Sequence, residues 1–446
     1  MRFLSSLVNV WKIPDLRSRV LFTLGLLVIY RLGGMIPVPG VDSNALKAFF
    51  SQSTNDLFNL YNLFVGGAFS HAAVFALGVM PYISASIIIQ LMGSIVPAIA
   101  QLQKDGQEGR NKLTQWTRYL TVGVAALQAS GVAIFLLNVS TSDGGSIVLD
   151  SFRSGIGRVA FTAITILTLT TGTMFVMYLG EQITARGIGN GISLIIFIGI
   201  VGRIPSGIIN EFKLWQAGEH SIFNVLIICA IVWAIVAFII LVDQGIRRIP
   251  LQSPRRVVGR REMGGAASFL PLKVNTAGVI PVIFASSIVF VPSTLASFFP
   301  EVPSIQDFAR LFLPGHWAYS VFFSVLVIFF AYFYTAIQYN PNDIADNLKK
   351  SGAFIPGIRP GKKTSEFVDY VLTRITLPGA IFLAVISVGP QYLKEYFHMS
   401  FYIGGTSVLI CVGVALETLR QLEGHLMTRN YEGFLSKGRL RGRRGF

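Results

Sequence analysis

Ten long apolar runs, separated by polar segments, constrain this chain more than any other feature. A bilayer core about 30 Å thick requires about 20 mostly apolar residues per helical span, and most of these runs approach that length. Only 13% of the 446 residues are charged, against about 25% in a typical soluble domain. We therefore predict an all-α membrane protein. The predicted spans are residues 20–36, 74–96, 120–137, 159–179, 188–201, 222–242, 274–298, 318–337, 368–388 and 403–419.

The distribution of basic residues orients these spans. With the N-terminus in the cytoplasm, the inner segments hold 29 of the 37 Lys and Arg residues, as the positive-inside rule requires. An even number of spans places both termini on the same side. We expect a multi-pass protein of the cytoplasmic (inner) membrane with both termini cytoplasmic.

The spans divide into an N-terminal half, residues 1–210, and a C-terminal half, residues 211–446. Each half holds five spans, and because five is odd the halves must have opposite orientations, which is the arrangement of an inverted repeat. The halves show no convincing residue-level similarity. Transporters and channels both use this architecture, so it constrains the fold more than the function.

Three loops are longer than the topology requires. The outer segment 37–73 ends in a glycine-broken apolar stretch, residues 61–69, which fits either a small re-entrant helix or an interfacial loop helix. The inner segments 243–273 and 338–367 carry many basic residues among glycine and proline turns. Positive-inside bias accounts for the charge, whereas the extended hairpin-like form favours a docking surface for a cytosolic partner.

The residues that usually carry catalysis or ion coupling are scarce. None of the five histidines has a metal-ligand spacing. The segment 187–191 lacks the glycine spacing of a nucleotide loop and opens an apolar span. The span interiors are almost free of charge, and Arg31 lies near an outer span end, where a long side chain can reach the interface. We expect no enzyme activity, cofactor or metal, and a transporter of neutral solutes stays open.

Four longer motifs, in order along the chain, carry a family resemblance: ALGVMPYISAS at 76–86, GEQITARGIGNGIS at 180–193, LPLKVN at 270–275 and SGAFIPGIRPG at 351–361. With them the chain resembles the SecY family, the channel subunits of the bacterial Sec protein translocase, over essentially its whole length. The resemblance implies two inverted five-helix halves that form a clamshell around an hourglass pore.

The resemblance also implies a ring of apolar side chains that closes the pore at its waist, and a plug that fills the outer funnel at rest. An apolar constriction excludes water and ions without selecting one peptide sequence. The ring falls on Val79, Ile83, Ile192, Ile196, Ile283 and Ile410. The plug falls on the segment 64–73, with Phe64, Val65, Gly66, Gly67, Ala68 and Phe69 as its candidate residues.

Spans two and seven become the two sides of a lateral gate through which a signal sequence or membrane segment leaves the pore into lipid. The gate-facing polar residues are Ser84, Gln90, Ser286 and Ser287. The basic loops become a docking site for a ribosome or a motor ATPase, with Arg255, Arg256, Lys273 and Arg359 as contact residues. Ser253 and Pro254 stand where the family commonly has tyrosine and alanine. Proline removes a backbone donor and fixes φ, so the loop tip that carries Arg255 and Arg256 departs from the family pattern.

The function implied is a protein-conducting channel that moves unfolded secretory polypeptides across the membrane and releases membrane segments into lipid. Its expected partners are SecE-like and SecG-like small membrane subunits, a SecA-like motor ATPase, the ribosome, an unfolded preprotein with its signal sequence, and membrane lipid. A neutral-solute transporter and a membrane scaffold without transport are the alternatives. Stabilisation by a solute would favour the transporter, and partner binding without translocation would favour the scaffold.

Overall fold

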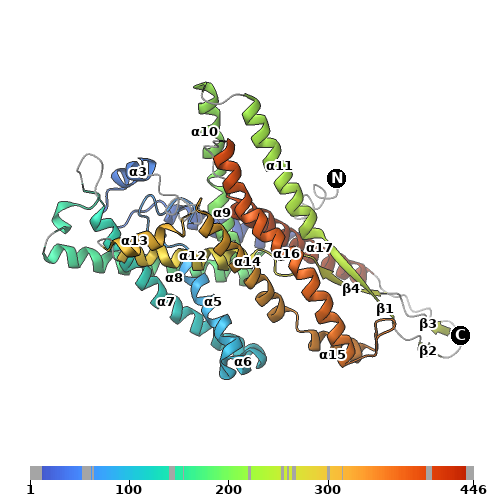
Figure 1. Cartoon of the computed structure of the whole chain (residues 1–446). Coiled ribbons are helices and arrows are strands. Elements are labelled where there is room, and N and C mark those ends of the chain that lie inside the picture. The colour runs from blue at the N-terminus through green and yellow to red at the C-terminus, as the bar shows by residue number, and fades with distance from the viewer. Residues whose placement is uncertain are drawn as a thin grey trace. The chain divides into compact units, whose positions relative to one another are not determined.

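The computed structural model describes residues 13–52, 62, 65–139, 146–153, 155–218, 222–252, 256–258, 261–263, 268–298, 302–313, 315–397 and 404–437. The described elements are helical except for four short strands (Figure 1). In chain order they are α2 (Pro14–Gly33), α3 (Ser43–Gln52), α5 (Met80–Ile95), α6 (Pro97–Lys104), α7 (Gly106–Asn138), η1 (Asp150–Phe152), α8 (Ile156–Arg186), α9 (Gly191–Val201), α10 (Ile204–Gln216), α11 (Ile222–Gln244), β1 (Ile246–Leu251), β2 (Arg256–Val258), β3 (Arg261–Met263), β4 (Ser268–Lys273), α12 (Ile280–Phe298), α13 (Pro303–Arg310), α14 (Trp317–Gln338), α15 (Pro341–Ser351), α16 (Lys362–Phe397) and α17 (Gly405–Lys437).

Each of the ten predicted spans coincides with a helix: α2, α5, α7, α8, α9, α11, α12, α14, α16 and α17. Among the described residues, seven helical stretches are long and apolar enough to cross a membrane, and eight if α5 and α6, which meet at a bend of 107°, count as one broken span. The other two are weaker for visible reasons. Helix α2 carries Asp15, Arg17, Arg19 and Arg31, and the apolar part of α12 is short.

Helices α5 and α12 begin later than the apolar runs predict, at Met80 and Ile280 instead of residues 74 and 274. Each is preceded by a glycine with positive φ, Gly78 at 54° and Gly278 at 64°, which ends any helical path from upstream. In both, proline is the second helical residue, where its missing N–H leaves no hydrogen bond unmade. Residues 78–81 and 278–281 share the pattern Gly-Val-x-Pro. This is a local similarity between the two halves that the sequence analysis missed.

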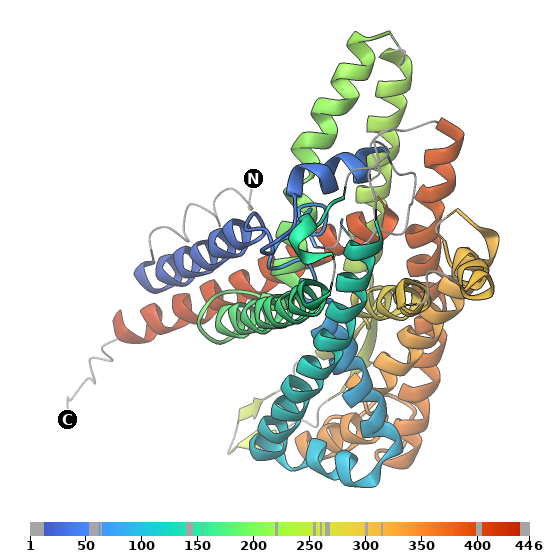
Figure 2. The same ribbon diagram turned by 90° about the vertical axis from the view of Figure 1, so that its left-hand side faces the viewer.

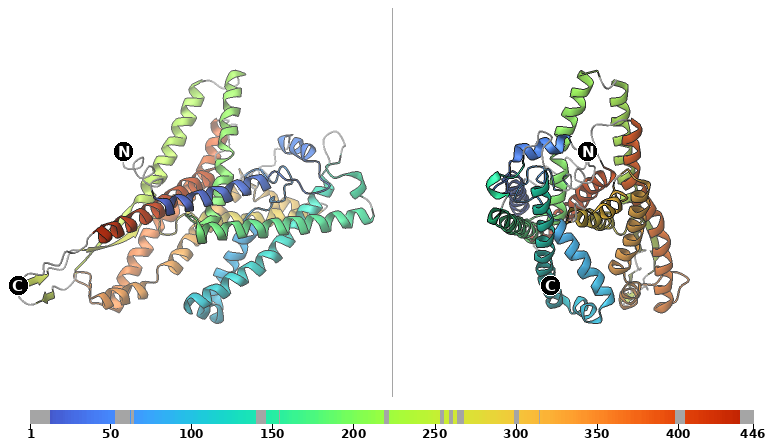
Figure 3. Two further views of the ribbon diagram at one scale, coloured as in Figure 1. Left: turned by 180° about the vertical axis from the view of Figure 1, so that it is seen from behind. Right: turned by 60° about the vertical axis from the view of Figure 1, so that its left-hand side comes forward.

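The chain forms two compact units, the first made of Met1–Ile204 and Val414–Phe446 and the second of Pro205–Gly413. In the first unit, α7 packs against α5, α6 and α8. A hydrophobic cluster holds the two ends of this unit together. In it, Leu16 of α2, Ile188 before α9 and Leu422 of α17 bury one another. Accordingly α2 and the C-terminal part of α17 run side by side (Figure 2 and Figure 3).

In the second unit, α14 packs between α12 and α16, and α15 packs on α16. The edge-to-face pair of Phe284 and Phe330 and the 2.8 Å hydrogen bond between the hydroxyls of Thr276 and Thr335 join the α12 region to α14. Strands β1 and β4 pair antiparallel from Ile246 opposite Lys273 to Leu251 opposite Ser268, and β2 pairs with β3. This ribbon is the hairpin-like projection predicted for the first basic loop (Figure 1).

The segment between the two halves, residues 202–221, is helical over α10 and is therefore not the simple loop that the sequence suggested. Its sequence explains the helix, since Ile208, Ile209 and Phe212 recur at helical spacing. The same three side chains are 61%, 54% and 53% exposed.

Candidate functional site

The described part of the predicted plug, from Val65 onward, is a succession of turns and not the small helix considered from the sequence. Gly66 and Gly67 have φ of 71° and 93°, values that side-chain-bearing residues rarely adopt. The backbone amide of Gly67 donates to the carbonyl oxygen of Asn62 at 2.8 Å, and the amide of Ser70 donates to the Asn62 side chain at 3.1 Å. Buried Asn62 thus fixes the turn. Phe64 lies outside the described residues.

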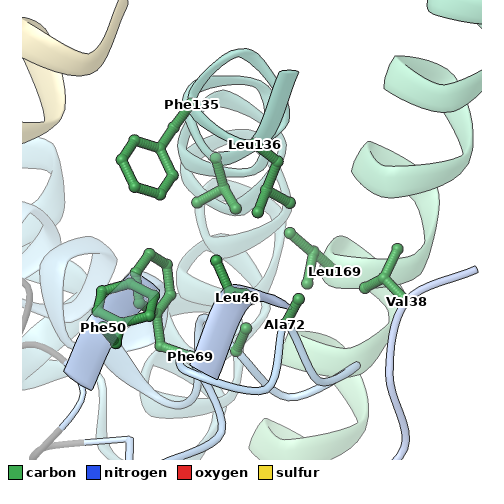
Figure 4. A pocket seen from close by; sticks show the side chains of 10 residues that line it. Val38, Leu46, Phe50, Phe69, Ala72, Phe135, Leu136 and Leu169 are labelled. Carbon is green, nitrogen blue, oxygen red and sulfur yellow. The ribbon is translucent and has the colours of Figure 1, made fainter. Parts of the chain in front are cut away.

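The other end of the plug is anchored by Phe69, which is 6% exposed. Its ring lies edge-on to Phe50 of α3, with centroids 5.6 Å apart, and stacks with Phe135 of α7 at 6.4 Å. Figure 4 shows Phe69 and Phe50 facing Phe135 and Leu136, with Leu46 and Leu169 beside them. Helix α3 therefore packs on Phe69 of the predicted plug, a partner that the sequence analysis missed.

His71 lies in the predicted plug segment. Partial burial, and then the nearby Lys47, lower the pKa of His71 below its usual value. Both causes disfavour the charged form of the imidazole.

The plug contacts the neighbours of predicted ring residues in the first unit. The side chain of Val65 lies 3.3 Å from the position that a Cβ on Gly78 would take, directly before Val79. Gly66 packs on Gly199 of α9, because a Cβ added to Gly66 would lie 2.8 Å from the Gly199 Cα. Val79, Ile83 and Ile196 are buried, and Ile192 is half-buried.

The remaining ring residues, Ile283 and Ile410, lie in the second unit, and both are buried. Their helices meet where Val279, one turn before Ile283, fills the space that a Cβ on Gly413 would need. Each unit therefore holds two segments that carry predicted ring residues. The motif match predicts these positions, and no motif indicates the glycine contacts.

Three of the four predicted gate residues, Gln90, Ser286 and Ser287, form hydrogen bonds within their own helices. Ser286 and Ser287 are buried, and their hydroxyls donate to the carbonyl oxygens of Val282 and Ile283 at 2.8 and 3.0 Å. Gln90 donates to the Ser86 hydroxyl at 3.2 Å, and Ser84 is half-buried. Local hydrogen bonds of this type lower the cost of placing polar side chains in apolar surroundings.

The short connection between α8 and α9 is held by side chains on three sides. The amide of Ile188 donates to the Thr23 hydroxyl at 3.1 Å, and the amide of Gly191 donates to the Thr184 hydroxyl at 2.9 Å. Asn190 caps α9 by accepting from the amides of Ile192 and Ser193. These contacts explain the glycine-rich sequence as a tight turn, since a Cβ on Gly191 would overlap the Gly180 carbonyl.

The two basic loops form one platform in the second unit. Gln252 and Phe354 exchange two backbone hydrogen bonds of 2.9 Å and so join the β ribbon to the second loop. Beneath them Ile249, Leu272 and Ile355 share a buried cluster with Val368 of α16. Rigid support of this kind is what a docking surface requires.

The predicted docking residues occupy different parts of this platform. Arg359 is exposed in the second loop, and Lys273 is the half-buried last residue of β4. Arg256 begins β2, and only its backbone is described. Arg255 lies outside the described residues, as do Ser253 and Pro254. The altered loop tip is thus not described.

The sequence places Arg31 near a span end, from which a long side chain can reach the membrane interface, and in the structure its guanidinium binds backbone carbonyls. Its guanidinium donates to the carbonyl oxygen of Gly66 in the plug at 3.1 Å and to that of Gly199 in α9 at 3.3 Å, and it also donates to the carbonyl of Ile198. A charged residue at a span end was the only sequence signal for this site.

At the opposite ends of the spans, Arg118 of α7 and Glu181 of α8 form a two-bond ion pair at 3.0 and 2.7 Å.

Within the described residues no group of three or more His, Cys, Asp or Glu side chains is placed to hold a metal ion. The long apolar helices, the buried turns from Val65 onward and the supported basic platform define a class: a multi-pass α-helical membrane protein with a basic surface.

Comparison with known proteins identifies the family. The SecY family model matches residues 73–419. The chain is 44% identical over 431 residues to the protein translocase subunit SecY of Haemophilus influenzae, and 42% identical over 431 residues to that of Escherichia coli, with 96% of each chain covered in both cases. The chain belongs to the SecY family.

Solved structures show the same fold. A structure described as a protein conducting channel matches with a TM-score of 0.63 at 17% identity, covering 91% of both chains. Sec61 from a canine ribosome–channel complex matches with a TM-score of 0.61 at 16% identity, again covering 91% of both chains. The related chains are translocase subunits and protein-conducting channels, and none of these descriptions names an enzyme.

Proposed function

We propose that this chain is a protein-conducting channel of the cytoplasmic membrane, which passes unfolded secretory polypeptides outward and releases membrane-protein segments sideways into lipid. The observation that carries the proposal is the plug: Val65 packs on Gly78, directly before Val79, and Gly66 packs on Gly199, three residues after Ile196. A buried segment at that place closes a path when it is docked and opens one when it leaves.

The ring residues Val79, Ile83, Ile192, Ile196, Ile283 and Ile410 form the constriction in this proposal. All six are aliphatic. Such a constriction resists ions by excluding water, and it offers a passing chain no fixed hydrogen-bond geometry. That property suits a channel whose substrates share no sequence.

Helices α5 and α12 form the lateral gate in this proposal, with Ser84, Gln90, Ser286 and Ser287 along it. The described hydrogen bonds of Gln90, Ser286 and Ser287 stay within one helix. Separation of the two helices would therefore break none of these bonds. This supports a gate that opens at low cost.

The platform of Arg256, Lys273 and Arg359, with Arg255, docks a cytosolic driver in this proposal. A ribosome presents an RNA surface that exposed arginine binds with strong salt dependence, and one of the solved relatives is ribosome-bound. A SecA-like motor ATPase is the other driver, and SecE-like and SecG-like membrane subunits complete the assembly. Since 29 of the 37 basic residues lie in segments on one side of the membrane, both termini are cytoplasmic.

The test is disulfide crosslinking in reconstituted vesicles. Ile83→Cys is introduced into a variant lacking Cys229 and Cys411, and a stalled secretory precursor carries one cysteine. Ile88→Cys is the matched control, because Ile88 lies on the same helix and is 39% exposed. We expect a crosslink at position 83 that depends on the signal sequence and an energised driver, and none at position 88.

The outcomes separate the candidate functions. Vesicles that translocate but give no crosslink at position 83 would show that the ring assignment is wrong. Absence of translocation, with a small solute that stabilises the protein against heat, would favour the neutral-solute transporter. Partner binding without translocation or conductance would favour the scaffold.

A further inference from the structure

Arg31 joins two parts of the first unit that move separately in a gated channel. Its guanidinium contacts the plug at the carbonyl of Gly66 and contacts α9 at the carbonyls of Ile198 and Gly199. Beside it, the hydroxyl of Tyr30 donates to the carbonyl of Val65 at 3.3 Å. Two consecutive residues of α2 thus hold two consecutive carbonyls of the plug.

The residues around this contact are closely packed. The Arg31 guanidinium fills the space that a Cβ on Gly202 would need. Gly66 lies so close to α9 that a Cβ there would come within 2.8 Å of the Gly199 Cα. Glycine at both positions therefore lets the arginine and the plug backbone approach the end of α9.

The end of α9 suits a cation. The last carbonyls of a helix carry the negative end of the helix dipole, and here the Ile198 carbonyl accepts from the Gly202 amide at 3.1 Å as well as from Arg31. The planar guanidinium presents several N–H groups in a fixed fork, so one arginine serves carbonyls on two segments, which a lysine ammonium does less well. The same helix carries the ring residues Ile192 and Ile196.

We propose that Arg31 is a positioning residue that couples plug retention to the position of α9: the plug stays docked while α9 stays in place, and a displacement of α9 releases it. This inference rests on the proposed channel function. A chain that enters the ring pushes on Ile192 and Ile196, shifts the carbonyls of Ile198 and Gly199, and thereby loosens the arginine that holds Gly66.

The test uses Arg31→Gln, Arg31→Lys and Gly202→Ala. Gly202→Ala displaces the guanidinium while leaving its charge in the protein. Arg158→Gln is the control, because Arg158 is an exposed arginine near the start of α8 in the same unit. The first readout is hydrogen–deuterium exchange of the segment 65–73 in purified protein, and the second is resting ion conductance of vesicles without precursor.

We expect Arg31→Gln and Gly202→Ala to raise both exchange and conductance by about tenfold or more, the effect of losing a hydrogen bond to a charged group. Arg31→Lys should recover part of the loss, and Arg158→Gln should leave both unchanged. Unchanged exchange in folded Arg31→Gln and Gly202→Ala proteins would overturn the proposal. Faster exchange of the segment 65–73 without a rise in resting conductance would overturn the proposed coupling between plug retention and α9.

Failure of the channel function itself would look different. Wild-type vesicles would then fail to translocate a precursor, whereas the exchange measurement would still decide whether Arg31 holds the plug. Should Arg31→Gln fold poorly, Gly202→Ala and Arg31→Lys supply the same comparison at intact charge.

Discussion

Truncation of the plug anchor, Phe69→Ala, should open the resting channel. Phe69 is 6% exposed and pairs with Phe50 and Phe135 at 5.6 and 6.4 Å. Removal of a buried phenylalanine costs about 3–5 kcal/mol, because apolar contacts are lost and a cavity remains, and each aromatic pair contributes about 0.5–1.5 kcal/mol within that total.

The cost falls largely on the docked plug, since the released plug does not bury this ring. If about 3 kcal/mol is lost from the docked state, the ratio of docked to released plug falls roughly a hundredfold, at about 1.4 kcal/mol per factor of ten. The assay is single-channel or vesicle conductance in the absence of precursor, with the thermal unfolding midpoint measured in parallel.

Phe223→Ala is the control, because Phe223 lies on α11 and is 71% exposed. It removes the same side chain and should leave conductance unchanged. A Phe69→Ala protein that folds normally and shows wild-type resting conductance would refute the reasoning, since the aromatic pocket would then not hold the plug closed.

Three further predictions concern the connection between α8 and α9, the start of α12 and the basic platform. Thr184→Val removes the acceptor of the Gly191 amide and should lower the free energy of urea unfolding by about 1–3 kcal/mol. Thr162→Val is the control, because among the described contacts its hydroxyl bonds only its own helix. This variant should lower the free energy of unfolding by less than about 1 kcal/mol. Gly278→Ala has open space around the new Cβ but a φ of 64°, so backbone strain alone should lower stability by about 1 kcal/mol; no change in the unfolding midpoint would contradict this account. Arg359→Glu should weaken binding of the cytosolic driver and flatten its salt dependence, while Arg310→Glu, in α13 on the predicted outer side, should not; equal losses in a binding titration would mean that the platform is not the docking surface.

The helices were largely predictable because membrane insertion imposes a length and an apolar composition that are written locally in the chain. All ten predicted spans fall on helices, and the first basic loop is the projecting hairpin that its turns and length suggested. The starts of α5 and α12 were missed by six residues each, because the residues before Gly78 and Gly278 are apolar without being helical. Hydropathy alone does not report the sign of φ.

The candidate site was less accessible to sequence reasoning. Motif matching named Val65, Gly66 and Phe69 as plug residues without saying what holds them. The partners come from distant segments: Phe50 from the outer loop, Phe135 from α7 and Arg31 from α2. A charged residue near a span end is common, and nothing adjacent to Arg31 in the chain indicates that its ligands lie 35 and more than 160 residues away.

The sequence by itself determined the membrane class, the spans and the family, since each of these depends on local composition or on a contiguous motif. Only the tertiary structure decided that the described part of the predicted plug is a set of turns held by Arg31 and Phe69, and that the two basic loops share one core. The physical reason is that hydrogen bonds to backbone carbonyls and close glycine contacts depend on the geometry of segments far apart in the chain. A carbonyl oxygen is the same in every residue, so no side-chain pattern marks the ones that bind.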